Sequence, residues 1–145
     1  MLNSTPGLVL VADDDENDVF FLKRAFRQAG LRCPIVDVPN GEEAIRYLSE
    51  GGSDHEHHPL PALLLLDLKM PLLDGFDVLS WLQKQPEFKE MPIVVLTSSG
   101  FESDIDRARK LGARDYLVKP RTPDDLVKLV QDISLHWLTA ELPAS

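Results

Sequence analysis

The sequence predicts a doubly wound α/β domain, in which helices cover both faces of a five-stranded parallel sheet. Short apolar runs rich in Val, Ile and Leu alternate with segments of helical periodicity, in a strand–helix order repeated five times. Helices of about three turns are long enough to return the chain for a parallel strand by a right-handed crossover. The 145 residues, 43% of them hydrophobic, suffice for one packed core. We therefore expect a single domain over residues 1–145, with its core at about residues 7–138 and no separate output domain.

The strands are predicted from apolar runs that are nearly continuous. Parallel strands buried on both faces lack the apolar–polar alternation of a strand with one wet face. The first, third and fourth runs are strong, whereas the second and fifth are weaker examples of the same kind. The expected strands are Leu8–Ala12, Ile35–Val38, Ala62–Leu66, Ile93–Leu96 and Tyr116–Val118.

The helices are predicted from periodicity together with start and stop signals. Gly30 and Gly112 follow two of the periodic segments and are typical helix stops. Thr122 is a capping residue for the last helix, and Pro123 suits its first turn. The expected helices are Glu16–Ala29, Glu42–Ser49, Phe76–Gln85, Asp104–Leu111 and Asp124–Leu138.

Composition limits the partners and the compartment. Fifteen basic against twenty-four acidic residues give a net charge of −9, which disfavours binding to nucleic acid. Cys33 is the only cysteine, so the chain suits a reducing compartment. The longest apolar run, Leu60 to Leu66, is too short to span a membrane, and the N-terminus lacks the basic start of a signal peptide. We expect a cytoplasmic protein that binds neither nucleic acid nor membrane.

Acidic side chains follow two of the predicted strands. Ligands of a doubly wound sheet bind beyond the carboxyl ends of its strands, so the residues at those ends are the candidates for function. Asp13 and Asp14 follow the first strand, and Asp67 follows the third. Clustered carboxylates raise one another's pKa unless a cation neutralises them. Mg²⁺ is the expected ion, because its ligands are oxygens and it keeps room for water and a phosphate.

Asp67 is a candidate nucleophile. An aspartate at the end of a buried strand, beside a metal, can attack a phosphoryl group and form an aspartyl phosphate. Lys119, at the end of the fifth strand, is placed to pair with Asp67 or with the phosphoryl oxygens, and Thr97 to donate a hydrogen bond to them. Each residue alone is weak evidence, and their joint placement carries the hypothesis.

A calcium loop is the first alternative for the acidic segment. Asp13, Asp15 and Asn17 match the start of an EF-hand loop, but Asp18 stands where that loop needs glycine and Arg24 where it needs glutamate. The segment also follows a predicted strand where an EF-hand needs a helix. We reject this alternative and interpret Asp15 as the cap of the first helix.

Four segments together resemble the receiver domain of a two-component response regulator. They are VLVADDD, LLLLDLKMPLLDG, PIVVLTSS and GARDYLVKP, and the resemblance covers residues 7–138. It implies the flavodoxin-like receiver fold, with strand order 2-1-3-4-5. It also implies a phosphoacceptor signalling protein and no enzyme in the usual sense: a histidine kinase phosphorylates Asp67 in the presence of Mg²⁺, and the output is a phosphorylation-dependent protein contact.

The resemblance also assigns roles to individual residues. It implies Asp14 as a direct Mg²⁺ ligand, Asp13 as a ligand acting largely through water, and Asp67 as both ligand and phosphoacceptor. The backbone carbonyl of Lys69 is the further ligand. The remaining roles are the switch pair Thr97 and Tyr116, the phosphate-contacting Lys119, and a cis peptide bond between Lys119 and Pro120.

Several features depart from the family pattern. Lys69 places an amine two residues after the phosphoacceptor, where it can pair with the phosphoryl group or obstruct the water of intrinsic dephosphorylation. Arg121 occupies a position that is often apolar in the family. The Glu50–Pro61 loop is longer than in minimal receivers. With the expected lack of an output domain, this resembles the lone receivers that partner bacteriophytochromes.

The candidate partners are therefore a sensor histidine kinase, of the bacteriophytochrome type or another, or a phosphotransfer protein. A downstream protein target and a second copy of the chain are further candidates. The switch hypothesis is that Thr97 moves toward the phosphoryl group and that Tyr116 then turns inward, which changes the surface offered to partners.

Other interpretations remain open. A haloacid-dehalogenase-type phosphatase also forms an aspartyl phosphate, but it usually needs a second aspartate where this chain has Lys69. A phosphorylation-independent binding module that only keeps the fold is the other alternative. The tract of His55, His57 and His58 is interpreted as solvated, with a metal site as the less favoured hypothesis.

Overall fold

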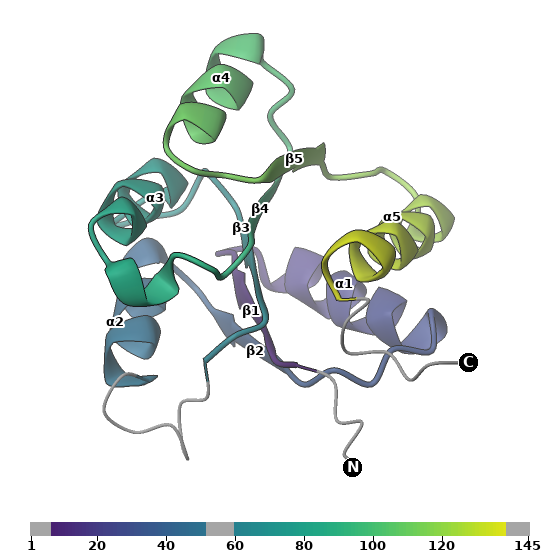
Figure 1. Cartoon of the computed structure of the whole chain (residues 1–145). Coiled ribbons are helices and arrows are strands. Elements are labelled where there is room, and N and C mark those ends of the chain that lie inside the picture. The colour runs from purple at the N-terminus through teal and green to yellow at the C-terminus, as the bar shows by residue number, and fades with distance from the viewer. Residues whose placement is uncertain (1–6, 52–59, 139–145) are drawn as a thin grey trace.

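A parallel sheet of five strands forms the centre of the protein. The computed structural model describes residues 7–51 and 60–138, and Figure 1 shows the sheet between two layers of helices. The strand order β2-β1-β3-β4-β5 is the predicted one, and every pairing is parallel. The doubly wound α/β fold is thus confirmed. The strands are β1 (Val9–Ala12), β2 (Ile35–Val38), β3 (Leu63–Leu66), β4 (Ile93–Thr97) and β5 (Asp115–Val118).

Helices cover both faces of the sheet, and each layer has its own core. Helices α1 and α5 pack together on one face, and α2, α3 and α4 lie on the other (Figure 1). Strands β1 and β3 are buried along their whole length, which explains why their sequences are continuously apolar. The helices are α1 (Glu16–Gln28), α2 (Gly41–Gly51), α3 (Gly75–Gln83), α4 (Glu102–Lys110) and α5 (Pro123–Trp137), with a 3₁₀ turn η1 (Pro86–Phe88).

Caps fix several of the helix ends that the sequence predicts. The Asp15 carboxylate accepts hydrogen bonds from the first turn of α1, and the Thr122 hydroxyl accepts one from the first turn of α5. Gly30 and Gly112 adopt φ values of 79° and 108°, in the left-handed region that favours glycine after a helix. By contrast α4 begins two residues before the predicted Asp104, because its start has no side-chain cap to mark it.

The strand register brings the predicted site residues to one edge of the sheet. The Asp67 amide donates to the Ala12 carbonyl at 2.9 Å, so Asp67 and Asp13 leave neighbouring strands side by side. The Lys119 amide donates to the Thr97 carbonyl at 2.7 Å, which joins the ends of β4 and β5 in the same way. Four site residues from four strands therefore meet at the carboxyl edge.

Two loops beside this edge are locked together. The Gly41 amide donates to the Leu73 carbonyl at 2.9 Å, and a Cβ atom on Gly41 would lie 2.2 Å from that carbonyl oxygen. Glycine is therefore required at position 41 by close backbone approach. Leu72 next to this contact has a φ of 67°, an uncommon value for a residue with a branched side chain.

Two expectations fall wholly or partly outside the described residues. The histidine tract lies outside them, as does most of the Glu50–Pro61 loop. Among the helices of residues 7–51 and 60–138, we find none that combines the length and the apolar character needed to cross a membrane.

Candidate functional site

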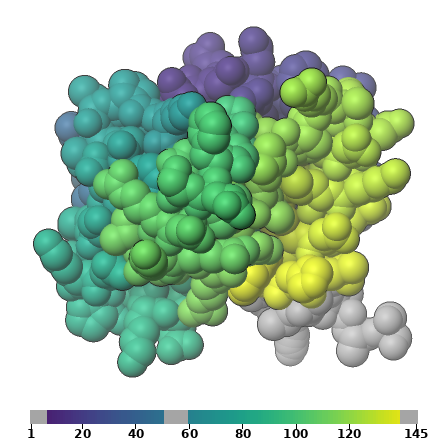
Figure 2. Space-filling model, turned by 90° about the horizontal axis from the view of Figure 1, so that it is seen from above, coloured from purple at the N-terminus to yellow at the C-terminus, as the bar shows by residue number. Residues whose placement is uncertain are grey.

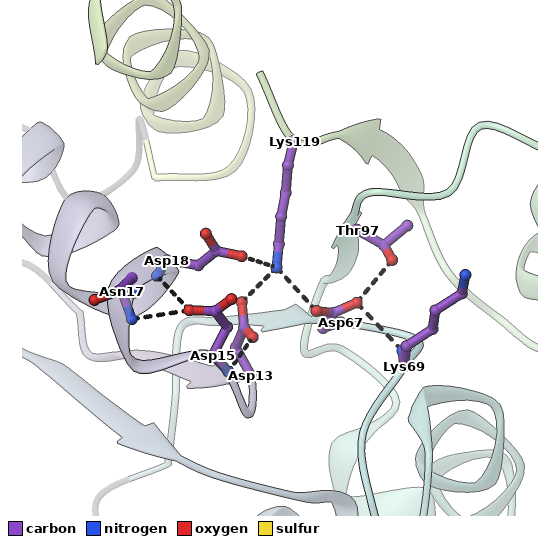
Figure 3. Close-up of polar contacts among 8 residues, drawn as sticks. All are labelled: Asp13, Asp15, Asn17, Asp18, Asp67, Lys69, Thr97 and Lys119. Atoms are coloured by element: carbon purple, nitrogen blue, oxygen red, sulfur yellow. Dashed lines mark hydrogen bonds and ion pairs between the residues drawn. The ribbon is translucent and has the colours of Figure 1, made fainter. Parts of the chain in front are cut away.

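Asp67 lies at the centre of the candidate site, and both of its carboxylate oxygens are engaged. Oδ1 accepts a hydrogen bond from Thr97 Oγ1 at 2.7 Å and another from the Lys69 amide at 3.2 Å. Oδ2 is 2.9 Å from Lys119 Nζ (Figure 3). Only 6% of the residue is exposed. The carboxylate is thus held in one orientation at the end of a buried strand.

The predicted cluster of three carboxylates is present. Asp13, Asp14 and Asp67 each offer an oxygen, and these oxygens all lie within 4.8 Å of one another. Asp13 and Asp67 are buried and Asp14 is exposed, so the cluster is open to solvent on one side. Oxygen donors with an open side suit a hard divalent cation that keeps part of its water shell. The residues therefore fit a divalent metal ion.

Lys119 bridges three carboxylates, from the loop after β1, the first turn of α1 and the loop after β3. Its Nζ lies 2.8 Å from Asp13, 2.7 Å from Asp18 and 2.9 Å from Asp67. Burial alone lowers the pKa of Lys119, but the hydrogen bonds to these carboxylates outweigh burial and raise that pKa above its ordinary value. The ammonium group therefore stays charged and offsets part of the acidic cluster.

Asp18 is not among the site residues that the sequence predicts. It lies in the first turn of α1, where acidic residues are common because they interact favourably with the helix dipole. Because this general explanation is sufficient for an acidic residue at this position, the sequence does not indicate the specific contact with Lys119. The only available signal is that α1 begins directly after the acidic segment, which keeps Asp18 close to the carboxyl edge of the sheet.

Asp13 has a perturbed pKa. Burial is the largest cause and raises the pKa of Asp13 from 3.8 to about 6, and the charge of Asp67 acts in the same direction. Hydrogen bonds from Lys119 and from the Asp15 amide, the latter at 2.9 Å, act in the opposite direction. Ionised Asp13 is therefore incompletely compensated by the protein, and a bound cation would stabilise it further.

The two predicted switch residues lie inside the protein. Thr97 is fully buried, and the Tyr116 hydroxyl donates a 2.8 Å hydrogen bond to the Ser99 carbonyl. The Ser99 hydroxyl in turn donates to Asp104 Oδ2 at 2.6 Å, which ties the β4–α4 loop to α4. The hypothesis has Tyr116 turn inward after phosphorylation, and this structure holds Tyr116 in an inward position, with 8% of the residue exposed.

The structure tests one of the two backbone expectations. The predicted cis peptide bond between Lys119 and Pro120 is wrong for this structure, in which the bond is trans. Proline lowers the preference for trans to about 0.5–1 kcal/mol but does not reverse it. Lys69 contacts Asp67 through its backbone amide, and its side chain extends away from the Asp67 carboxylate (Figure 3). The Lys69 carbonyl remains a predicted ligand.

A cavity of about 390 Å³ opens beside Lys119, between α1 and the start of α5. Its walls are mainly apolar and include Phe21 and Leu126, with Arg121 at one side. Asp18 and Lys119 also line it. The ion pair between them therefore forms part of the cavity wall.

Comparison with known families identifies the family to which this chain belongs. The family described as response regulator receiver domain matches residues 9–131, which include every residue of the predicted site. This chain is a response regulator receiver domain. Receiver domains are phosphoacceptors in signal transduction, and this membership disfavours the alternative of a dehalogenase-type phosphatase.

Individual relatives cover almost the whole receiver. Response regulator Rcp1 from Synechocystis sp. is 33% identical over 144 residues, covering 99% of this chain and 97% of the relative. The crystal structure of the Mn²⁺-bound form of Rcp1 has a TM-score of 0.81 at 34% identity and covers 96% of this chain and 100% of that one. The phosphorylated cyanobacterial phytochrome response regulator RcpA has a TM-score of 0.84 at 29% identity, covering 94% and 96% of the two chains. Response regulator RPA3017, in red light signaling of R. palustris, has a TM-score of 0.85 at 32% identity, covering 96% and 99%.

Proposed function

We propose that this receiver accepts a phosphoryl group on Asp67 from a sensor histidine kinase, with Mg²⁺ bound, and signals by phosphorylation-dependent protein contact. One observation carries the proposal. The Asp67 carboxylate is buried between a hydroxyl donor, Thr97, and a charged amine, Lys119, next to the carboxylates of Asp13 and Asp14. A buried carboxylate with this surrounding is suited to attack on phosphorus.

The chemistry is a phosphoryl transfer from nitrogen to oxygen. A carboxylate oxygen of Asp67 forms a bond to phosphorus while the bond from phosphorus to the histidine nitrogen breaks, and that electron pair stays on the imidazole. Such transfers depend on positioning and charge neutralisation more than on acid–base catalysis. Lys119 supplies positive charge to the phosphoryl oxygens, and Thr97 supplies a hydrogen-bond donor.

The proposed ligands of Mg²⁺ are Asp13, Asp14, Asp67 and the Lys69 carbonyl. The spacing of the three carboxylates supports a divalent cation, and Rcp1, which is similar to this chain, has been crystallised in a Mn²⁺-bound form. When bound, the cation neutralises the carboxylates and the incoming phosphoryl oxygens. Hard oxygen ligands and an open side favour Mg²⁺ as the physiological ion.

The proposed phosphodonor is a phytochrome-type histidine kinase. RcpA is a cyanobacterial phytochrome response regulator, and a bacteriophytochrome response regulator, RtBRR, is 30% identical to this chain with a TM-score of 0.74. A different histidine kinase or a phosphotransfer protein is the alternative. Phosphoryl transfer from autophosphorylated kinases, compared at equal concentrations and short times, would identify the preferred donor.

The proposed output surface is the face made by α4, β5 and α5. Seen from above, the green residues of α4 lie across the middle of this view and the yellow-green to yellow residues of α5 beside them (Figure 2). Phe101 is 68% exposed and Val118 47% exposed, so apolar side chains are available for a protein contact. The partner is a downstream protein or a second copy of the chain. A net charge of −9 argues against nucleic acid, and tight, salt-sensitive binding to a DNA duplex would contradict this.

The proposal is tested by mapping phosphorylation. The chain is incubated with acetyl phosphate and Mg²⁺, and the modified residue is identified by mass spectrometry. We expect one phosphoryl group on Asp67, none in Asp67→Asn, and normal labelling in Asp106→Asn, which removes an exposed carboxylate of α4. Label that persists in Asp67→Asn, or that forms at the same rate in excess chelator, would contradict the site or the metal. A parent protein that takes up no label would favour the phosphorylation-independent binding module.

A further inference from the structure

We infer that Asp18 is a positioning residue for Lys119. It holds the ammonium group beside residue 67 before, during and after phosphoryl transfer. This inference rests on the proposed function, because it concerns how Lys119 meets the phosphoryl group. It starts from the geometry of the ammonium group, which lies between Asp18 on one side and Asp67 on the other (Figure 3).

The contact with Asp18 is at least as close as those with the predicted site residues. Lys119 Nζ is 2.7 Å from Asp18 Oδ2, 2.8 Å from Asp13 Oδ2 and 2.9 Å from Asp67 Oδ2. An ammonium group has three N–H donors, so three carboxylates can use all of them. Lys119 Nζ donates hydrogen bonds to Asp18 and Asp67 and forms an ion pair with Asp13, so carboxylates surround the amine.

The three partners differ in what the reaction does to them. Asp13 and Asp67 belong to the group of carboxylates that can hold a cation, and Asp67 also becomes the phosphorylated residue in the proposed reaction. Both therefore acquire a competing partner or a new substituent. Asp18 does not belong to that group. It is the carboxylate that remains available to Lys119 in every state of the site.

The backbone around Asp18 is suited to this role. The Asp15 carboxylate accepts hydrogen bonds from the Asn17 amide at 2.9 Å and from the Asp18 amide at 3.1 Å, which fixes the first turn of α1. Asp18 thus projects from a capped helix. Lys119, by comparison, reaches the site through a long side chain with several rotatable bonds.

The cavity beside the ion pair offers the Lys119 side chain an alternative position. Asp18 and Lys119 both line this space of about 390 Å³, so shortening Asp18 would enlarge it next to the ammonium group. Without the Asp18 carboxylate, the Lys119 amine would also occupy the cavity and solvent. It would therefore spend a smaller fraction of the time facing the phosphoryl group. Because Asp18 is 42% exposed, the expected effect is moderate: a loss of about threefold to fivefold in rate, in the range of a partly exposed ion pair.

The experiment compares initial rates of Asp67 labelling by acetyl phosphate at saturating Mg²⁺. We expect Asp18→Ala to be about threefold to fivefold slower than the parent, and Asp18→Asn, which keeps an acceptor oxygen, to be slower by less than about twofold. Glu16→Gln is the control, since it removes an exposed charge from the same turn of α1. In a Lys119→Met background, Asp18→Ala should change the rate no further, because the amine that it positions is gone.

A second measurement follows the ammonium group directly and does not depend on phosphorylation. In ¹H–¹⁵N NMR spectra of the metal-free protein, the Nζ signal of Lys119 is assigned by its loss in Lys119→Met. We expect that signal in the parent and in Asp18→Asn, and its broadening or disappearance in Asp18→Ala, because an unrestrained amine exchanges its protons rapidly with water.

The outcomes separate this inference from the proposed function. If Asp18→Ala matches the parent in rate and in the Lys119 signal, or slows labelling equally in the Lys119→Met background, the positioning role is wrong. If Glu16→Gln slows labelling as much as Asp18→Ala does, the cause is a general effect of charge and not the positioning of Lys119. A parent protein that takes up no label would defeat the proposed function, and the NMR comparison would still decide whether Asp18 holds Lys119.

Discussion

Thr97 Oγ1 donates a 2.7 Å hydrogen bond to Asp67 Oδ1. Tyr116 is also turned inward, with its hydroxyl on the Ser99 carbonyl. Both members of the expected switch pair therefore lie in the positions that the hypothesis assigns to the phosphorylated protein. We expect a phosphoryl group on Asp67 to stabilise this arrangement against others, which is a shift of populations.

Thr97→Val should uncouple phosphorylation from its output. The variant keeps the shape of threonine but has no hydroxyl donor, while Asp67 and the carboxylate cluster are unchanged. We expect it to accept phosphate from acetyl phosphate and yet to lose most of the phosphorylation-dependent change in partner binding or self-association, as should Thr97→Ala. Sedimentation of phosphorylated and unphosphorylated forms measures this. A Thr97→Val protein that responds as fully as the parent would show that the switch works in another way.

Lys119→Met should destabilise the metal-free protein by about 2–4 kcal/mol, because it leaves buried carboxylates without their cationic partner. Added Mg²⁺ should reduce that loss by replacing the missing positive charge. Urea denaturation with and without Mg²⁺ measures both effects. Lys23→Met is the matched control: the Lys23–Asp37 pair is 2.6 Å long but exposed, so its loss should cost less than about 1 kcal/mol. Equal losses in the two variants would rule out a special role for the buried pairs.

Asp13 should make the metal-free protein less stable as the pH rises from about 4 to about 7. Its pKa is about 6 in the folded protein against 3.8 as the ordinary value, so the folded state binds more protons than the unfolded state between these values. Stability then falls with rising pH, by an amount on the order of 2 kcal/mol for this residue.

Denaturation of the chelated protein across this pH range measures the effect. Asp13→Asn cannot titrate, so its stability should fall less with pH than that of the parent, while the exposed Asp106→Asn should follow the parent curve. If Asp13→Asn and the parent show the same pH dependence, the raised pKa of Asp13 is wrong. Mg²⁺ should restore stability above pH 6, since it binds the ionised carboxylate.

Local patterns predicted the elements well because the physical signals are local. Strands β1 and β3 are buried on both faces and are therefore continuously apolar, and the ends of α1 and α5 carry capping side chains or glycines. The 3₁₀ turn Pro86–Phe88 is too short to produce a periodic pattern, so it was missed. The strand order came from the family resemblance, because periodicity does not encode which strands pair.

The site was predictable where the chain position alone determines the location. Asp13, Asp67 and Lys119 directly follow strands, so the sheet edge collects them. Asp18 was missed because its contact depends on the direction of a long lysine side chain. The inward position of Tyr116 likewise depends on tertiary packing, which no short-range pattern encodes.

Gly41→Ala should be strongly destabilising and should also disturb the site. A Cβ atom at this position would lie 2.2 Å from the Leu73 carbonyl oxygen, a backbone atom that cannot rotate away. The Gly41 amide also donates to that carbonyl, so relief of the clash would break this hydrogen bond and shift the β3–α3 loop. We expect a loss of more than about 2 kcal/mol in stability, in the range of overpacking a tight site, and slower labelling of Asp67 at the start of the same loop.

Gly100→Ala is the control, because its Cβ would meet only a Val118 methyl group at the ordinary distance of 3.8 Å. Urea denaturation and the acetyl phosphate assay on both variants measure the difference; a Gly41→Ala protein as stable and as readily labelled as Gly100→Ala would show that the two loops are not locked together in solution.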